Sequence, residues 1–182
     1  MSYRYEIRLS GEGGQGLVLA GKILAEAAAI YDGKNATQSQ SYGPEARGGA
    51  SRSEVIISDE DIDYPKAINI DLLLALTQES CNKYSMDLKD DGILLVDSDS
   101  VKDCPPGKFK IYKVPIIESA RAKVGRVVVA NIVALGIIIE LTKIVSMDAI
   151  ESAILARVPK GTEKINMQAF QLGAEIGKEL LT

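Results

Sequence analysis

The sequence contains no histidine and no tryptophan, and it has only two cysteines, Cys81 and Cys104. Without histidine, the chain cannot build a Ser-His-Asp or Cys-His nucleophile system from its own residues. Two cysteines are too few for an iron–sulfur cluster or a four-ligand zinc site. We therefore expect ordinary thiols, no metal site and no catalytic residues, so that any reactive groups come from elsewhere.

An excess of positive charge and long apolar runs are also missing from the sequence. The formal net charge is -4, and no cluster of lysine and arginine offers a surface for tracking nucleic-acid phosphates. The longest apolar stretch, Val127–Ile139, contains Asn131 and is too short to cross a membrane. The first residues lack the apolar core of a signal peptide. These features predict a cytoplasmic protein with neither a nucleic-acid nor a membrane partner.

The hydrophobic pattern alternates between strand and helix. At 182 residues, 46% apolar and 25% charged, the composition is that of one globular domain spanning residues 1–182. Continuous apolar runs bounded by polar residues are typical of strands buried in a parallel sheet. The pattern predicts strands at Tyr5–Ser10, Asn35–Tyr42, Ser51–Ser58, Asp71–Thr77, Gly92–Asp97 and Lys110–Val114, and helices at Leu17–Ile30, at Gln78–Leu88 and from Ile116 onward. The predicted fold is a single Rossmann-like three-layer α/β domain with a mostly parallel sheet and a helical C-terminal third.

A glycine-rich turn joins the first predicted strand to the first predicted helix. The segment reads GEGGQG, and its glycines fit the G-x-G-x-x-G spacing of phosphate-binding turns. Such glycines permit a tight turn and close approach of an anion, and the helix dipole adds positive potential. The alternative is a turn in which the glycines serve packing only. The predicted anion contacts are Gly11, Gly13, Gly14, Gln15 and Gly16.

A second loop follows the second predicted strand, at the edge where open α/β sheets bind ligands. The stretch Ser41–Ser53 reads SYGPEARGGASRS and brings Arg47, Gly48 and Arg52 to this edge. The guanidinium fork of arginine suits phosphate and carboxylate groups. For Arg52, an ion pair with a neighbouring glutamate such as Glu54 is the favoured alternative. For Arg47, beside the predicted anion site, we favour ligand binding.

A simple NAD enzyme is disfavoured by what the second strand lacks. A nicotinamide dinucleotide site needs an acidic residue about 20 positions beyond the glycines, at the end of that strand. Here the strand ends in Ser39, Gln40, Ser41 and Tyr42, and Asp32 comes too early.

These motifs together resemble the gamma subunit of 2-oxoacid:ferredoxin (acceptor) oxidoreductases. The resemblance rests on GEGGQG at Gly11–Gly16, SYGPEARGG at Ser41–Gly49 and SEVIISDEDIDYP at Ser53–Pro65, and extends over essentially the whole length. The loop variant is most similar to the 2-oxoglutarate branch, because the related indolepyruvate enzymes tend to carry a histidine there. The chain is thereby identified as a single pyruvate/ketoisovalerate oxidoreductase gamma-type domain.

The resemblance implies a division of labour that suits the missing residues. In this family a 2-oxoacid is oxidatively decarboxylated on thiamine diphosphate, electrons leave through iron–sulfur clusters to ferredoxin, and coenzyme A accepts the acyl group. Thiamine diphosphate and the clusters belong to partner subunits, one of them ferredoxin-like. This chain would bind no cofactor tightly and would contribute subunit assembly and coenzyme A binding at the complex interface. Coenzyme A phosphates are expected where the two glycine-rich loops meet.

Two other functions remain open from the sequence. One is a free-standing nucleotide- or flavin-binding protein that uses the GEGGQG turn directly. The other is a pure assembly scaffold with an empty anion site. If the chain is a subunit of the oxidoreductase or an assembly scaffold, the isolated chain is expected to be inactive. It is then also expected to associate with itself through surfaces intended for partners.

Overall fold

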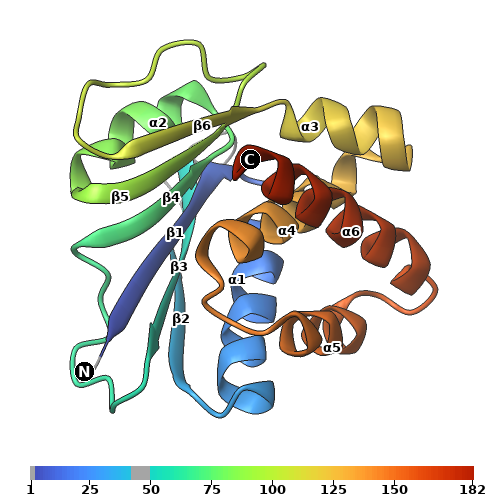
Figure 1. Ribbon diagram of the computed structural model, residues 1–182, viewed down its shortest axis with the longest axis horizontal. Helices are drawn as coiled ribbons and strands as arrows, with labels where there is room; N and C mark the ends of the chain where they lie inside the picture. Colours follow the sequence, from blue (N-terminus) through green and yellow to red (C-terminus); the bar gives the residue numbers. More distant parts are fainter. Residues whose placement is uncertain (1–2, 42–49) are drawn as a thin grey trace.

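A six-stranded sheet forms the centre of the protein. The computed structural model describes residues 3–41 and 50–182. The strand order is β2-β3-β1-β4-β5-β6 (Figure 1). The strands are β1 (Arg4–Glu12), β2 (Asn35–Ser41), β3 (Ala50–Ser58), β4 (Ile70–Ala75), β5 (Leu88–Asp97) and β6 (Lys110–Val114).

The sheet is mixed because β3 runs against the others. β1, β4, β5 and β6 form parallel ladders, whereas β3 is antiparallel both to β1 and to β2. Two reversals give β2 the same direction as β1, so that five strands point one way and the mostly parallel prediction is confirmed. The carboxyl ends of β1 and β2 therefore lie at the same edge of the sheet, but β3 separates them.

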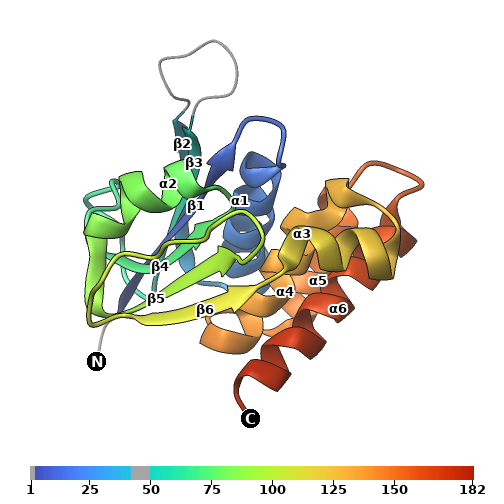
Figure 2. The same ribbon diagram turned by 90° about the horizontal axis from the view of Figure 1, so that it is seen from above.

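Helices cover both faces and make the predicted three layers. The short helix α2 (Gln78–Tyr84) packs on one face against β1, β3 and β4. The other face carries the remaining α-helices, with α6 packed on α4 rather than on the sheet (Figure 2). These are α1 (Leu17–Glu26), α3 (Ile116–Ser119), α4 (Ala130–Thr142), α5 (Met147–Arg157) and α6 (Glu163–Leu180).

Several predicted boundaries were wrong. The first helix is α-helical only to Glu26 and continues as a π-helical turn over Ala27–Tyr31. The predicted helix Gln78–Leu88 ends at Tyr84, passes through a short 3-10 turn, and Leu88 already begins β5. Pairing of Ile70 with Leu88 explains this difference, because a ladder to β4 stabilises an extended chain where local periodicity favoured helix.

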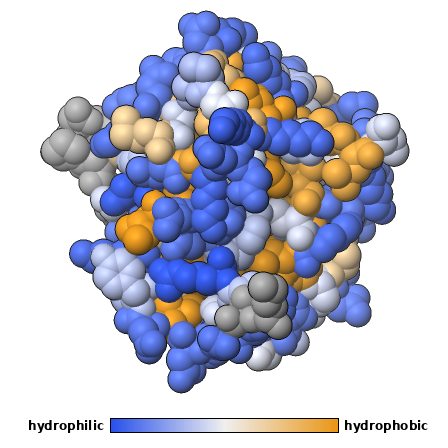
Figure 3. All heavy atoms as spheres, turned by 60° about the vertical axis from the view of Figure 1, so that its left-hand side comes forward, coloured by the Kyte–Doolittle hydropathy of each residue, from blue (hydrophilic) through white to orange (hydrophobic). Residues whose placement is uncertain are grey.

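The surface in Figure 3 is mostly hydrophilic, with apolar side chains in separate patches. Among the helices of the described residues, none combines the length and apolarity needed to cross a membrane.

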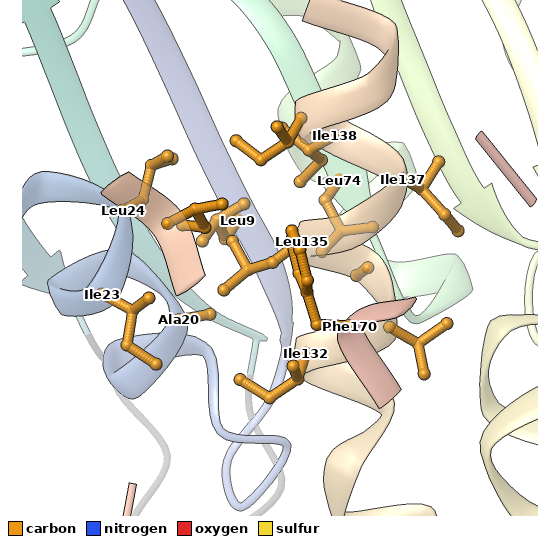
Figure 4. Close-up of a cluster of buried hydrophobic side chains, with 14 of the residues drawn as sticks. Leu9, Ala20, Ile23, Leu24, Leu74, Ile132, Leu135, Ile137, Ile138 and Phe170 are labelled. Atoms are coloured by element: carbon orange, nitrogen blue, oxygen red, sulfur yellow. The ribbon is translucent and has the colours of Figure 1, made fainter. Parts of the chain in front are cut away.

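The main core lies between the sheet and the helices α1, α4 and α6. Leu9 and Leu74 project from β1 and β4 toward α4 and the fully buried ring of Phe170 on α6 (Figure 4). All residues of α4 from Ala130 to Glu140 are buried, which explains its apolar sequence on every side. Each large side chain buried in this way contributes about 1.5–3 kcal/mol. The core holds the end of β1 and the start of α1 in a fixed relation.

Candidate functional site: the glycine turn between β1 and α1

The glycine turn changes the direction of the chain between the end of β1 and the start of α1. Gly14 and Gly16 have φ angles of 90° and 73°, which strain any residue with a Cβ atom. Gly13 has no positive φ, and a Cβ atom there would meet nothing within 4 Å. Gly14 and Gly16 therefore require the backbone conformation that glycine permits. Gly13 does not, and a side chain at this position would point into open space.

Gln15 folds back to hold the turn. Its Oε1 accepts a hydrogen bond from the backbone N–H of Glu12 at 2.9 Å. A Cβ atom on Gly11 would lie 2.1 Å from this Oε1, so Gly11 makes room for the Gln15 side chain. Gln15 therefore has a structural role through its oxygen, and its amide nitrogen is the part that a ligand could use.

Asn131, at the start of α4, fixes the turn from the other side. Its Nδ2 donates to the backbone oxygen of Gly16 at 2.9 Å, and its Oδ1 accepts from the N–H of Ile132 at 2.9 Å. The side chain is buried, and such buried amides are normally paired in this way. A Cβ atom on Gly16 would lie 2.4 Å from Asn131 Nδ2. Gly16 therefore adopts a positive φ and also allows α4 to approach the turn closely.

The N-terminus of α1 opens into a hollow that suits an anion. The hollow measures about 300 Å³ and is lined by residues 12–18 together with Ser51. No side chain caps this helix, and its first turn carries no acidic residue. The exposed N–H groups and the positive end of the helix dipole are therefore left for a ligand. Glu12 is the one charged residue in the lining and opposes a bound anion.

A second, more apolar hollow of about 260 Å³ adjoins the turn. Its walls include Gly14 and Gln15 on one side and Val127 and Val128 on the other. Val128 is 69% exposed, which is unusual for a large aliphatic side chain. The two hollows share Gly14 and Gln15, so a ligand with a charged group and a less polar arm could occupy both.

The structure does not bring Arg52 to the glycine turn. Arg52 pairs with Ser10 in the β1–β3 ladder, whereas the next residue, Ser51, pairs with Gly11. Since successive side chains of a strand point to opposite faces, Ser51 lines the glycine hollow and Arg52 lies on the α2 face. There its Nε lies 3.3 Å from Glu54 Oε1, in agreement with the ion-pair alternative.

Arg47 and Gly48, the other predicted contacts of the second loop, lie outside the described residues. The sequence reasoning that placed this loop beside the glycine turn took the second strand to be adjacent to the first. That adjacency was wrong, because β3 lies between β1 and β2. Both strands still end at the same edge of the sheet.

Sequence reasoning missed Ser51 and the wall formed by Val127 and Val128. Ser51 is named by no motif, and it enters the hollow only through its antiparallel pairing with Gly11. The Val127–Val128 wall reads in sequence as part of a buried helix, although these residues form a partly exposed 3-10 turn before α4. Asn131 interrupts an apolar run in the sequence, and a buried amide there is expected to pair with backbone groups, as it does. In the lining of these two hollows, Glu12 is the one charged side chain.

Comparison with known proteins shows strong similarity over nearly the whole chain. The family model described as pyruvate ferredoxin/flavodoxin oxidoreductase matches residues 6–176. The 2-oxoglutarate synthase subunit KorC of Methanocaldococcus jannaschii is 54% identical over 179 residues, covering 97% of this chain and 96% of that protein.

Solved structures give the same result. The gamma subunit of keto/oxoacid ferredoxin oxidoreductase from Geobacter sulfurreducens is 59% identical, with a TM-score of 0.88, covering 96% of this chain and 99% of that one. Pyruvate oxidoreductase subunit PORC from Thermotoga maritima is 30% identical, with a TM-score of 0.78, and the match covers 94% of this chain and 96% of that one. These similarities extend over both the glycine turn and the helical C-terminal third.

Proposed function

The chain belongs to the pyruvate ferredoxin/flavodoxin oxidoreductase family, and we propose that it is the gamma subunit of a 2-oxoglutarate:ferredoxin oxidoreductase complex. The name of the M. jannaschii relative and the length of that match support this assignment. In the proposed complex, 2-oxoglutarate and coenzyme A yield an acyl-coenzyme A, CO₂ and reduced ferredoxin. Thiamine diphosphate and the iron–sulfur clusters that this reaction requires would be held by partner subunits.

The contribution proposed for this chain is to bind a phosphate group of coenzyme A at the glycine turn. The uncapped N-terminus of α1 carries this proposal, since it presents N–H groups and a positive dipole to a hollow of about 300 Å³. The adjoining apolar hollow beside Val127 and Val128 would suit the less polar arm of the same ligand. No step of bond making is assigned to residues of this chain.

A free-standing dinucleotide-binding enzyme is less well supported. In such enzymes an acid at the end of the strand next to β1 binds the ribose. Here the neighbouring strand on that side is β3, which is antiparallel and contributes Ser51 at that edge. The end of β2 carries Ser39, Gln40 and Ser41, none of them acidic.

A charge placed at Gly13 tests the proposed phosphate site. Gly13→Asp and Gly13→Asn are nearly equal in size, and both fit because the position is open and has no positive φ. The added carboxylate repels a bound phosphate. If this repulsion cancels one charged hydrogen bond, worth about 1.5–3 kcal/mol, Gly13→Asp should raise the KM for coenzyme A of the assembled complex by about 10- to 150-fold. Gly13→Asn should stay near the wild-type value.

Two further measurements complete the test. Glu12→Gln removes the opposing carboxylate and should lower the KM for coenzyme A. Decarboxylation of 2-oxoglutarate measured without coenzyme A should be unchanged in all three variants. If Gly13→Asp assembles normally and keeps the KM of Gly13→Asn, the turn does not bind coenzyme A, and a role in assembly alone is the better account.

A further inference from the structure

A hollow of about 700 Å³ lies on the α2 face of the sheet, where strands β2 and β3 meet the loop before β4. Its floor is formed by polar side chains of β1, β2 and β3, and its wall by residues 65–68. The residues that carry charge are Arg8, Arg52, Lys66, Glu54 and Asp87. Because it lies on the opposite face from the glycine turn, this hollow is separate from the proposed coenzyme A site.

Arg8 occupies the deep end of the hollow and binds both of its carboxylates. Its guanidinium group is almost completely buried and bonds Glu54 Oε2 at 3.0 Å and Asp87 Oδ2 at 2.5 Å. One buried cation therefore serves two acids. Three cations and two carboxylates line the hollow, so the surplus charge is positive and belongs to Arg52 and Lys66.

Arg52 is held in place but lacks a hydrogen-bond partner at one donor. Its guanidinium carbon lies 5.5 Å from the centre of the Tyr84 ring, a cation–π distance, and Tyr84 is itself buried. Its Nε is buried and donates no hydrogen bond to any described residue, although Glu54 Oε1 lies 3.3 Å away. A buried donor that bonds no acceptor among residues 3–41 and 50–182 can still take a ligand as its partner.

The polar groups around Arg52 fit an anionic acceptor. Ser39 and Ser41 of β2 share the face of Arg52 and Glu54, because each pairs with one of them in the β2–β3 ladder. Their hydroxyl groups add donors beside the arginine fork, and Lys66 adds a second cation from the wall. A guanidinium fork, an ammonium group and hydroxyls are the groups that bind phosphate and carboxylate.

We propose that this hollow is a second anion-binding site, in which Arg52 and Lys66 hold the phosphate or carboxylate group of a small ligand. The volume is within the range of small-molecule sites. Arg8 acts as a positioning residue, because it binds Glu54 and Asp87 and offsets one of their two charges, so that with Arg52 and Lys66 the lining carries one net positive charge.

The Nε–H resonance of Arg52 allows a direct test by NMR on the full-length chain. Inorganic phosphate and succinate, added separately at about physiological ionic strength, should shift this resonance and the backbone amides of Ser39, Ser41 and Lys66 with a saturable curve. The ligand that binds more tightly identifies phosphate or carboxylate as the preferred group. The backbone amides of the glycine turn report separately on any anion that binds at the other face of the sheet.

Variants distinguish a built site from general attraction to charge. Lys66→Gln should weaken binding about 10-fold, and Arg52→Lys, which keeps the charge but removes the fork and Nε, should weaken it by a similar factor. Arg121→Gln is the matched control, since it also removes one positive charge but lies on an exposed turn paired with Glu118. The absence of saturable shifts with both anions, or equal weakening by Arg121→Gln, would overturn the proposal.

Discussion

At the scale of single residues, the glycine turn depends on a residue that is distant in sequence. Asn131 satisfies the backbone oxygen of Gly16 and lies where a Cβ atom of that residue would be. The Gly16 oxygen also accepts from the N–H of Ala20 at 3.1 Å, so the Asn131 contact adds a second hydrogen bond, worth about 0.5–1.5 kcal/mol, that ties the start of α1 to α4. The proposed anion site is therefore shaped jointly by the turn and by α4.

Cys81 gives a prediction on the dependence of stability on pH. Burial, together with the neighbouring Cys104 thiol, raises the pKa of Cys81 to about 11. The unfolded chain has an ordinary thiol pKa of about 8.5 and loses its proton first as the pH rises. The free energy of unfolding should therefore decrease between pH 8 and pH 10, by at most about 2 kcal/mol from this group.

Urea unfolding of the wild type and of Cys81→Ala at both pH values isolates this contribution. The difference in the free energy of unfolding between the wild type and Cys81→Ala should become smaller at pH 10. Only the wild type carries the Cys81 thiol, whose ionisation at high pH favours the unfolded chain. Tyr5, whose pKa is raised by burial and by the carboxylates of Asp71 and Asp91, is present in both proteins and cancels in the comparison. An identical pH dependence in the two proteins would contradict the prediction.

At the scale of elements, α4 and α6 pack with their backbones in contact. A Cβ atom on Gly173 would lie 2.0 Å from the backbone oxygen of Val133, and one on Gly136 would lie 2.4 Å from that of Phe170. Such close approach is possible only where both helices carry glycine at the crossing. It places the buried Phe170 ring in the main core and fixes α4, which in turn carries Asn131 to the glycine turn.

Gly173→Ala should destabilise the protein even though alanine favours helix. Helix propensity alone would stabilise the variant by about 1 kcal/mol. Overpacking against Val133 opposes this and costs about 1–3 kcal/mol or more, so the predicted net effect is a lower Tm. Gln171→Ala, on the exposed side of the same helix, should change the free energy of unfolding by less than about 0.5 kcal/mol. A Tm at or above that of the wild type would show that the helices can separate without cost.

At the scale of the whole molecule, the relevant observations are the residue composition and the relatives' membership of complexes. The sequence has no histidine, and its two cysteines pack within one hydrophobic cluster on the α2 face. The relatives reported above are subunits of oxidoreductases, including 2-oxoglutarate synthase. Self-association of the isolated chain stays a prediction.

The isolated chain is expected to be inactive. With thiamine diphosphate, coenzyme A, 2-oxoglutarate and an artificial electron acceptor, it should reduce no acceptor, because it has no histidine and only two cysteines. Adding the purified partner subunits should restore turnover in proportion to the amount of this chain. Acceptor reduction by a preparation shown by mass spectrometry to contain no other subunit would refute the subunit assignment.

Much of the architecture could be predicted because it is local in the sequence. The period of the apolar residues predicted six strands close to their observed positions and the helical C-terminal third, and GEGGQG predicted a turn opening a helix. Errors fell at Leu88 and at Ala27–Tyr31, where pairing with β4 and packing beside α5 outweigh local preference. Absent residues were equally informative, since chemistry that needs histidine or a cysteine cluster can be excluded by counting.

The sequence by itself determined the glycine turn, the absence of histidine and the family. Only the tertiary structure decided which residues share a site. Antiparallel insertion of β3 sends Ser51 to the glycine turn and Arg52 to the opposite face, although the two are adjacent in the chain. Strand order and register arise from pairing between distant segments, and a shift of one residue exchanges the two faces. For that reason the hollow proposed as a second anion site became visible only in the folded protein.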